Sequence, residues 1–120
     1  MTVAGWGQLS DYGGTPRTLQ KAEVQVVEQQ ICEQQLQDAQ PSNTPYLDDT
    51  MFCAGDADGI KDACAGDSGG PIFYTNRFTG KNVLTGIVSW GFGCATKGLS
   101  GIYTDVSKFE LWINDVVSKN

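Results

Sequence analysis

Short stretches in which polar and apolar residues alternate predict a series of β-strands along the chain. Residues 2–7 form the first stretch, and residues 19–27 alternate as a strand with one buried face does. Apolar runs at residues 72–74 and 83–90 predict two more strands, the second of them buried. Gly86 interrupts that last run, and a glycine inside a strand permits a bulge or the close approach of another part of the protein.

A second kind of spacing, with apolar residues three or four positions apart, predicts two helices. Residues 27–37 have this spacing and are rich in Gln and Glu, which predicts a short helix. From Val106 to Val116 the apolar residues recur as in an amphipathic helix. We expect the apolar face to pack on the core, with recognition of a partner as the alternative. Glycine, proline, asparagine and aspartate mark the loops, most clearly at residues 8–17 and 41–45.

The composition indicates one folded globular domain. The chain has 120 residues, of which 40% are hydrophobic and 18% are charged. Its net charge of −6 disfavours non-specific binding to nucleic acid or to an anionic membrane and favours cationic partners, with an acidic surface of no further function as the alternative. No apolar run approaches the roughly 20 residues that span a bilayer, and the first residues lack the basic region of a signal peptide.

Four cysteines in a chain of this length predict a disulfide framework, which forms in an oxidising compartment. Four cysteines allow three pairings, and the sequence does not choose among them. Zinc binding is the competing interpretation, and we disfavour it because the chain has no Cys-x-x-Cys pair and no histidine. Residues 56–59 have the Asp and Gly of a calcium loop, but the other ligands of an EF-hand are missing, so we predict a turn there.

Ser68 stands in the most distinctive stretch of the chain, Asp-Ala-Cys-Ala-Gly-Asp-Ser-Gly-Gly-Pro at residues 62–71. A serine becomes a nucleophile when a base takes its proton, and acyl transfer also needs backbone N–H groups aimed at the oxyanion that forms. Glycines beside the serine let a substrate and such N–H groups come close. A glycine-rich turn with an ordinary surface serine is the alternative, and the nearby cysteine, the two aspartates and the Gly-Gly-Pro argue against it.

The Gly-x-Ser-x-Gly pattern at residues 66–70 also occurs in the nucleophile elbow of the α/β-hydrolases. That turn leads directly into a helix, and its histidine follows later in the chain. Pro71 and the strand predicted at residues 72–74 exclude the helix, and the chain contains no histidine. The elbow is therefore rejected.

Residues 62–71 resemble the active-site segment of the trypsin/chymotrypsin-like serine proteases, and other motifs in the family's order extend the resemblance along nearly the whole chain. These motifs are Val-Ala-Gly-Trp-Gly at 3–7, Met-Phe-Cys-Ala-Gly at 51–55, Ile-Val-Ser-Trp-Gly at 87–91 with Gly-Cys at 93–94, and Gly-Ile-Tyr-Thr-Asp-Val at 101–106. The resemblance covers only the second half of such a protease, because the family carries its histidine base and orienting aspartate on an N-terminal half. We therefore expect the chain to be part of a longer protein, whose missing portion would also account for the absent export signal.

The resemblance implies an all-β fold over residues 1–120. This fold is a chymotrypsin-like antiparallel Greek-key barrel of six strands with a C-terminal α-helix, the second barrel of the two-barrel protease. The resemblance also implies disulfides that join Cys32 to Cys53 and Cys64 to Cys94, and a secreted, extracellular protein.

The resemblance assigns roles to single residues as well. Ser68 is the expected nucleophile, the N–H groups of Gly66 and Ser68 are the expected oxyanion hole, and Asp62 is expected at the floor of the specificity pocket. A carboxylate at the end of a poorly hydrated slot favours an arginine or lysine side chain. The expected pocket walls are Ala63 with the two residues after it, Ser89, Trp90, Gly91 and Gly101.

The family pairs the equivalent of Asp67 with the α-amino group that is freed when the zymogen is cleaved. The activation site belongs to the other half of the protease, so this chain cannot supply that amine. We therefore predict a zymogen-like, partly disordered segment at residues 62–68.

The implied activity is that of a serine endopeptidase of peptidase family S1 that cleaves after Arg or Lys, without a cofactor or a metal. The expected partners are polypeptide substrates with Arg or Lys, the missing N-terminal half and protein protease inhibitors, and neither nucleic acid nor a membrane. We expect the chain alone to be inactive, because it lacks a histidine base. The alternative is a non-catalytic half-protease or pseudoprotease that binds partners through the Asp62 pocket.

Overall fold

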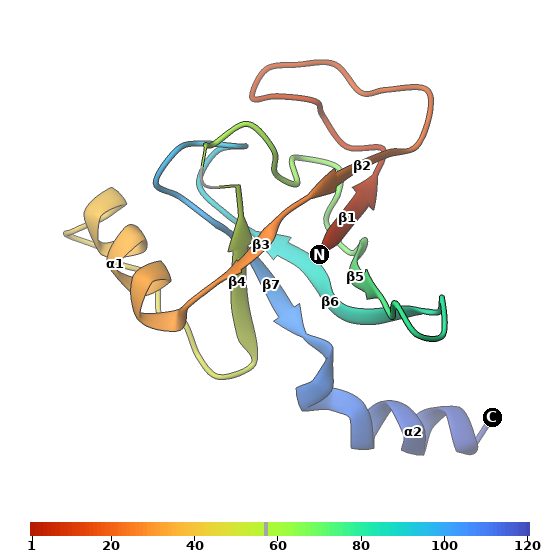
Figure 1. The fold of residues 1–120 in the computed structure, drawn as a ribbon. Helices are drawn as coiled ribbons and strands as arrows, with labels where there is room; N and C mark the ends of the chain where they lie inside the picture. Colours follow the sequence, from red (N-terminus) through yellow and green to blue (C-terminus); the bar gives the residue numbers. More distant parts are fainter. Residues whose placement is uncertain (57) are drawn as a thin grey trace.

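Seven antiparallel strands form the body of the molecule in the computed structural model, which describes residues 1–56 and 58–120 (Figure 1). The elements are β1 (Thr2–Gly5), β2 (Gln20–Glu23), β3 (Gln25–Val27), α1 (Gln29–Ala39), β4 (Met51–Gly55), β5 (Pro71–Thr75), β6 (Asn82–Trp90), β7 (Gly101–Asp105), the short 3₁₀ helix η1 (Val106–Phe109) and α2 (Glu110–Ser118). The turn predicted at residues 56–59 includes Ala57, which lies outside the described residues.

The sheet nearly closes into a barrel because one stretch of chain supplies both of its edges. The strands lie in the order β2-β1-β5-β6-β7-β4-β3, and Val24 alone separates β2 from β3. The Val24 side chain is buried, and its N–H donates to the carbonyl oxygen of Met1 at 2.9 Å. The strand predicted at residues 19–27 is therefore two strands that pair with β1 and with β4. The expected antiparallel barrel with a terminal helix is confirmed, with seven strands where six were expected.

Two clusters of buried side chains hold these elements together. The first fills the barrel and consists of Val3, Val24, Ala54, Ile72, Val88 and Tyr103. The second lies where α1 meets the sheet and consists of Cys32, Leu36, Leu47, Cys53 and Ile102. The disulfide Cys32–Cys53 ties α1 to β4, and the second disulfide joins Cys64 to Cys94. Both pairings that the resemblance implies are present, and α1 begins and ends two residues later than predicted.

β6 carries a bulge beside Gly86, as the sequence predicts. Its register with β5 shifts between the pair Ile72–Gly86 and the next pair along the strands. A Cβ at Gly86 would lie 2.6 Å from the ring of Phe52 and 2.8 Å from the side chain of Ile72, so the close approach requires glycine. The strand is not buried throughout, contrary to the prediction. Leu84 is 50% and Ile87 36% exposed.

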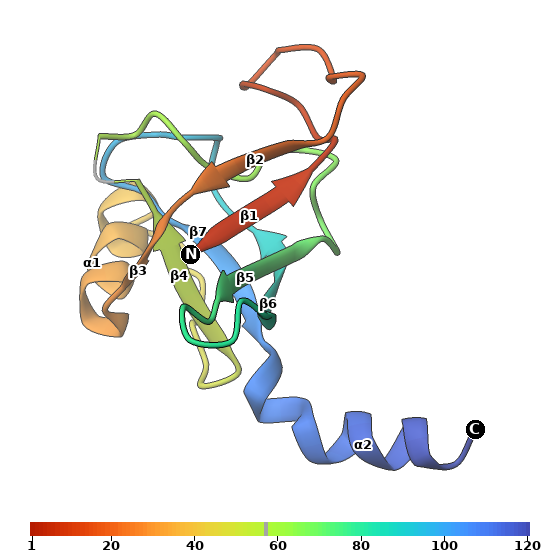
Figure 2. The ribbon, with the colours of Figure 1, turned by 45° about the vertical axis from the view of Figure 1, so that its right-hand side comes forward.

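The C-terminal helix does not pack on the core, and this part of the prediction is wrong. η1 begins directly after Asp105, whose carboxylate accepts a hydrogen bond from the N–H of Ser107 at 3.0 Å. α2 then projects away from the barrel (Figure 2) and contains no buried residue. Its apolar side chains are present as predicted, but Leu111 is 88% and Trp112 66% exposed. No helix in the described ranges combines the length and the apolar character that crossing a membrane would require.

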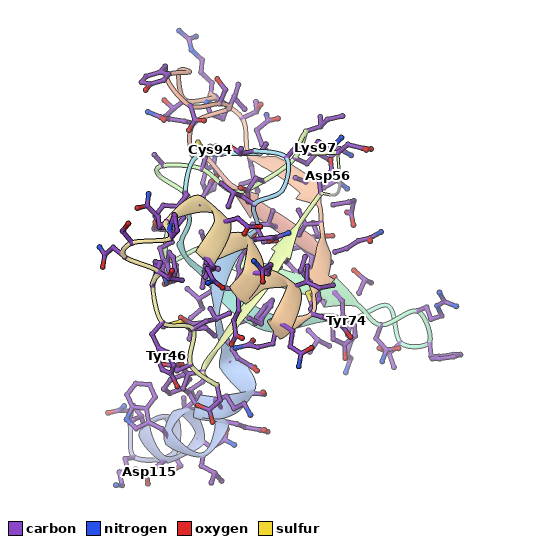
Figure 3. The ribbon with its side chains drawn as sticks, turned by 90° about the vertical axis from the view of Figure 1, so that its left-hand side faces the viewer. Tyr46, Asp56, Tyr74, Cys94, Lys97 and Asp115 are labelled. Carbon is purple, nitrogen blue, oxygen red and sulfur yellow. A yellow bond between two sulfur atoms is a disulfide. The ribbon has the colours of Figure 1, made fainter. Side chains whose placement is uncertain are left out.

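Three loops meet at the end of the barrel that lies away from α2, at residues 6–19, 58–70 and 91–100. In Figure 3, Cys94 on the third loop lies at the opposite end of the molecule from Asp115 in α2. The loops contact one another, since the N–H of Gln8 donates to the carbonyl oxygen of Ala65 at 2.8 Å. This end of the molecule carries most of the residues that the sequence predicts for the site.

Candidate active site

Ser68 is exposed on a tight loop between β4 and β5 that hydrogen bonds fix to the barrel. The N–H of Gly69 donates to the carbonyl oxygen of Val88 in β6, and the N–H of Val88 donates to the carbonyl oxygen of Gly70, both at 2.9 Å. Gly66 and Gly69 have φ of +96° and +84°, which is the left-handed region where glycine alone is unstrained. The backbone on either side of Ser68 therefore requires glycine, at Gly66 and at Gly69.

The carboxylate of Asp67 is held by two backbone N–H groups from opposite sides. Oδ1 accepts from Gly7 at 2.8 Å, and Oδ2 accepts from Cys64 at 2.9 Å. A Cβ at Gly5 would collide with Oδ1, and a Cβ at Gly7 would lie 2.5 Å from the carboxyl carbon. The Gly-Trp-Gly motif of the first strand thus makes room for the aspartate beside the serine. The zymogen-like disorder that we predict for residues 62–68 stays a prediction. Removing the two hydrogen bonds to Asp67 would test it directly, because an ordered segment depends on them and a disordered one does not.

A cavity of about 320 Å³ lies between this loop, the end of β6 and the start of β7. It brings together nine of the residues predicted for the nucleophile and the pocket, which are Asp62, Ala63, Cys64, Ala65, Ser68, Ser89, Trp90, Gly91 and Gly101. Gly66 and Asp67 do not line it. Other lining residues, among them Asp11 and Tyr103, were not predicted from the sequence.

Asp62 is half-buried at the cavity, and two backbone N–H groups hold its carboxylate. Oδ1 accepts from Ala63 at 2.8 Å, and Oδ2 accepts from Ala95 at 3.1 Å. Ala95 has a φ of 55°, a conformation uncommon for a residue with a Cβ, and it directs this N–H to the carboxylate. A Cβ at Gly101 would lie 2.9 Å from Oδ1, so glycine leaves the space that the carboxylate occupies.

Burial raises the pKa of Asp62 above its ordinary value, because the charged form loses contact with water. The hydrogen bonds from Ala95 and Ala63 oppose this shift, and the negative charges of Asp11 and Asp67 add to it. No Lys or Arg of the described residues forms a salt bridge with Asp62. A cation that enters the cavity would therefore find a partly desolvated carboxylate without a charged partner.

Tyr103 is a site residue that the sequence reasoning missed. Its ring stacks on Phe52 in the core, with centroids 5.4 Å apart, and its side chain is fully buried. The residue lines the cavity, and within the described residues its buried hydroxyl has no hydrogen-bond partner. Burial, followed by the charges of Asp62 and Asp67, raises the pKa of this hydroxyl, so it stays protonated. The signal in the sequence was its position two residues after Gly101, which places both on one face of β7.

The backbone N–H groups and the hydroxyl at Ser68 are free of internal partners among the described residues. In the described part of the chain, no hydrogen bond occupies the N–H groups of Gly66 and Ser68, and none involves the Ser68 hydroxyl. The sequence contains no histidine that could serve as the base. What the structure shows here is an exposed serine hydroxyl, two available N–H donors and a cavity lined by a carboxylate.

The family model for trypsin matches residues 1–113 of the chain. Trypsin-1 from Astacus astacus is 45% identical over 114 residues, which cover 92% of this chain and 44% of the relative. Transmembrane protease serine 7 from Rattus norvegicus is 43% identical over 117 residues, which cover 96% of this chain and 13% of the relative. Serine proteinase stubble from Drosophila melanogaster is 41% identical over 112 residues, which cover 93% and 14%. The chain thus spans less than half the length of each of these relatives.

Proposed function

The chain belongs to the trypsin family of serine proteases, and on this basis we propose that it is the nucleophile-bearing half of an endopeptidase that cleaves after Arg or Lys. One observation carries the proposal, namely that Ser68 and Asp62 line the same cavity. A basic side chain bound against Asp62 brings the carbonyl carbon that follows it in the substrate to the mouth of this cavity, where Ser68 stands.

In the proposed reaction, the Oγ of Ser68 bonds to the carbonyl carbon of the substrate while a base accepts the serine proton. The carbonyl oxygen becomes an oxyanion, to which the N–H groups of Gly66 and Ser68 would donate. The tetrahedral intermediate then breaks its C–N bond, and the amine leaves with the proton that the base held. The end of β6, at Ser89, Trp90 and Gly91, would pair with the extended substrate as an added strand.

The base must come from another half of the protein, because the chain has no histidine. We propose that the chain alone is inactive or nearly so. Serine proteases without their base keep at best about 10³–10⁴ over water, a figure taken from members of this same family. The exposed apolar side chains of α2, including Leu111 and Trp112, support the view that a further unit covers this helix.

The proposed partners are polypeptides with Arg or Lys, the histidine-bearing half and protein inhibitors that enter the same cavity. No cofactor or metal is part of the proposed reaction. The two disulfides support an extracellular location, because such bonds persist in oxidising surroundings.

A second candidate is a binding module without catalysis, which would keep the Asp62 cavity as a site for basic side chains. The absence of histidine favours it, because the cavity residues are intact although the chain has no base. The two candidates share the cavity and differ in whether Ser68 reacts.

Hydrolysis of an arginine-ester reporter tests the proposal, with the purified chain alone and mixed with the N-terminal half of a trypsin-like relative. Activity in the mixture only, abolished by Ser68→Ala, is the expected result. Activity of the chain alone would overturn the argument from the missing base. No hydrolysis in either sample, combined with binding of benzamidine, would favour the binding module.

A further inference from the structure

The loop between β1 and β2 carries a second carboxylate to the cavity, on Asp11. A tight turn positions it, because the N–H of Gly13 donates to the carbonyl oxygen of Ser10 at 3.0 Å and the N–H of Leu9 donates to the carbonyl oxygen of Gly14 at 3.3 Å. A Cβ at Gly13 would lie 2.5 Å from the Ser10 hydroxyl and 3.1 Å from the Ser10 nitrogen, so the turn is closely packed at this position. Figure 1 shows the loop at the same end of the molecule as the loop between β6 and β7.

The Asp11 carboxylate lies against the wall of the cavity formed by residues 93–94. A Cβ at Gly93 would lie 3.4 Å from its Oδ2. One of its oxygens and the sulfur atoms of Cys64 and Cys94 all lie within 4.8 Å of one another. Those sulfurs are bonded to each other as a disulfide, so they are not available to ligate a metal. Asp11 is exposed while Asp62 is half-buried, so the two carboxylates occupy the solvent side and the inner side of one cavity.

Neither carboxylate forms a salt bridge with a Lys or Arg of the described residues. The one salt bridge among the described residues joins Lys119 to Asp115 in α2, at the far end of the molecule. The negative charge of Asp11 acts on the Asp62 carboxylate, since it contributes to the raised pKa of Asp62. Two carboxylates therefore line the same cavity, and the outer one acts electrostatically on the inner one.

A separate observation points to a polar ligand in the same space. Tyr103 lines the cavity, and its fully buried hydroxyl has no hydrogen-bond partner among the described residues. A buried hydroxyl without a partner is costly, so a ligand N–H or a bound water in the cavity would satisfy it. An amidinium or guanidinium group at Asp62 carries several N–H donors, which matches this requirement.

We propose that Asp11 is a second specificity-determining residue, which makes the cavity selective for ligands with two positive charges. The inner charge binds at Asp62, and the outer charge, from a neighbouring basic residue of the same polypeptide, binds at Asp11. This inference rests on the proposed function, and it narrows the substrate class from Arg or Lys to a basic residue with a second basic residue beside it.

Binding of two probes to the full chain tests this inference. Benzamidine carries one positive charge and pentamidine, a flexible bisbenzamidine, carries two. Their dissociation constants are measured by calorimetry for the unaltered chain, for Asp11→Asn and for Asp115→Asn. The last variant makes the same change in net charge at the opposite end of the molecule (Figure 3).

We expect Asp11→Asn to lower the preference for pentamidine over benzamidine by about two- to fivefold, the usual range for an exposed ion pair. We expect Asp115→Asn to leave this ratio unchanged, and the Asp11 effect to shrink in high salt. An unchanged ratio in Asp11→Asn, with benzamidine still bound, would refute the role of Asp11 and leave the proposed function standing. Failure of the unaltered chain to bind either probe would refute both.

Discussion

Replacement of Asp67 by alanine should destabilise the protein strongly. The change leaves the N–H groups of Gly7 and Cys64 without the carboxylate that now accepts from them at 2.8 and 2.9 Å. A hydrogen bond to a charged group contributes about 1.5–3 kcal/mol, and we take the lower end because Asp67 is half-buried and water replaces part of the loss. Two such bonds give about 3 kcal/mol, a large share of the roughly 5–15 kcal/mol that a domain has in total.

Urea and thermal unfolding in non-reducing buffer measure this effect. At about 4 °C per kcal/mol for a domain of this size, the midpoint should fall by about 12 °C. Asp115→Ala is the matched control, because its carboxylate pairs with Lys119 on the surface at 3.0 Å, and such pairs contribute about 0–1 kcal/mol. Both variants remove one carboxylate, so their difference isolates the two backbone hydrogen bonds.

A change below about 0.5 kcal/mol in Asp67→Ala would refute the reasoning, since surface substitutions without a structural role fall in that range. It would favour the hypothesis that residues 62–68 are partly disordered, as in a zymogen. Hydrogen exchange gives a second readout of the same question. If the two bonds hold the segment, the amides of Gly7 and Cys64 exchange about as slowly as those of the core strands, and under the disorder hypothesis they exchange much faster.

Three further predictions concern the cavity and its supports. Burial raises the pKa of Asp62 above 3.8, so ionisation of this carboxyl lowers the stability of the folded state. Relative to Asp62→Asn, the chain should therefore lose stability as pH rises from about 4 through the raised pKa, which parallel urea titrations of the two proteins measure. Gly86→Ala places a methyl group 2.6 Å from the ring of Phe52 and should cost about 1–3 kcal/mol in urea unfolding, and no loss would show that the bulge relaxes freely. Changing both Cys64 and Cys94 to alanine should lower the free energy of unfolding by about 3–4 kcal/mol, because their disulfide closes a loop across 30 positions. Equal unfolding midpoints for the two proteins would contradict this.

The motifs of the sequence locate the site because they are made of residues whose geometry is restrictive. Gly66 and Gly69 adopt left-handed conformations. Gly5 and Gly7 leave room for Asp67, so each of these four positions requires glycine. The resemblance to a family supplied the disulfide pairing, which spacing alone left among three possibilities. The cavity residues from Asp62 to Gly101 follow from these motifs, and the structure brings them together.

What the sequence did not predict depends on contacts between distant parts of the chain. In the sequence, Tyr103 looks like one more apolar strand residue, and the cavity that it lines exists only when β7 packs beside the Asp62 loop. Asp11 lies in a loop whose composition predicts a turn. The composition does not predict which other residues this turn contacts. The division of one strand at Val24 follows from closure of the sheet, which no local pattern encodes. Periodicity gives α2 an apolar stripe, but it does not say which partner covers it.

The closure of the sheet at Val24 determines how copies of this chain can associate. In the described sheet, the outermost strands are β2, with four residues, and β3, with three, and they continue into each other. Such short edges offer little backbone for an intermolecular ladder, so growth of fibrils by strand addition is disfavoured. Self-association at high concentration should instead run through side chains such as Trp112, give small oligomers and disappear on dilution or with mild detergent.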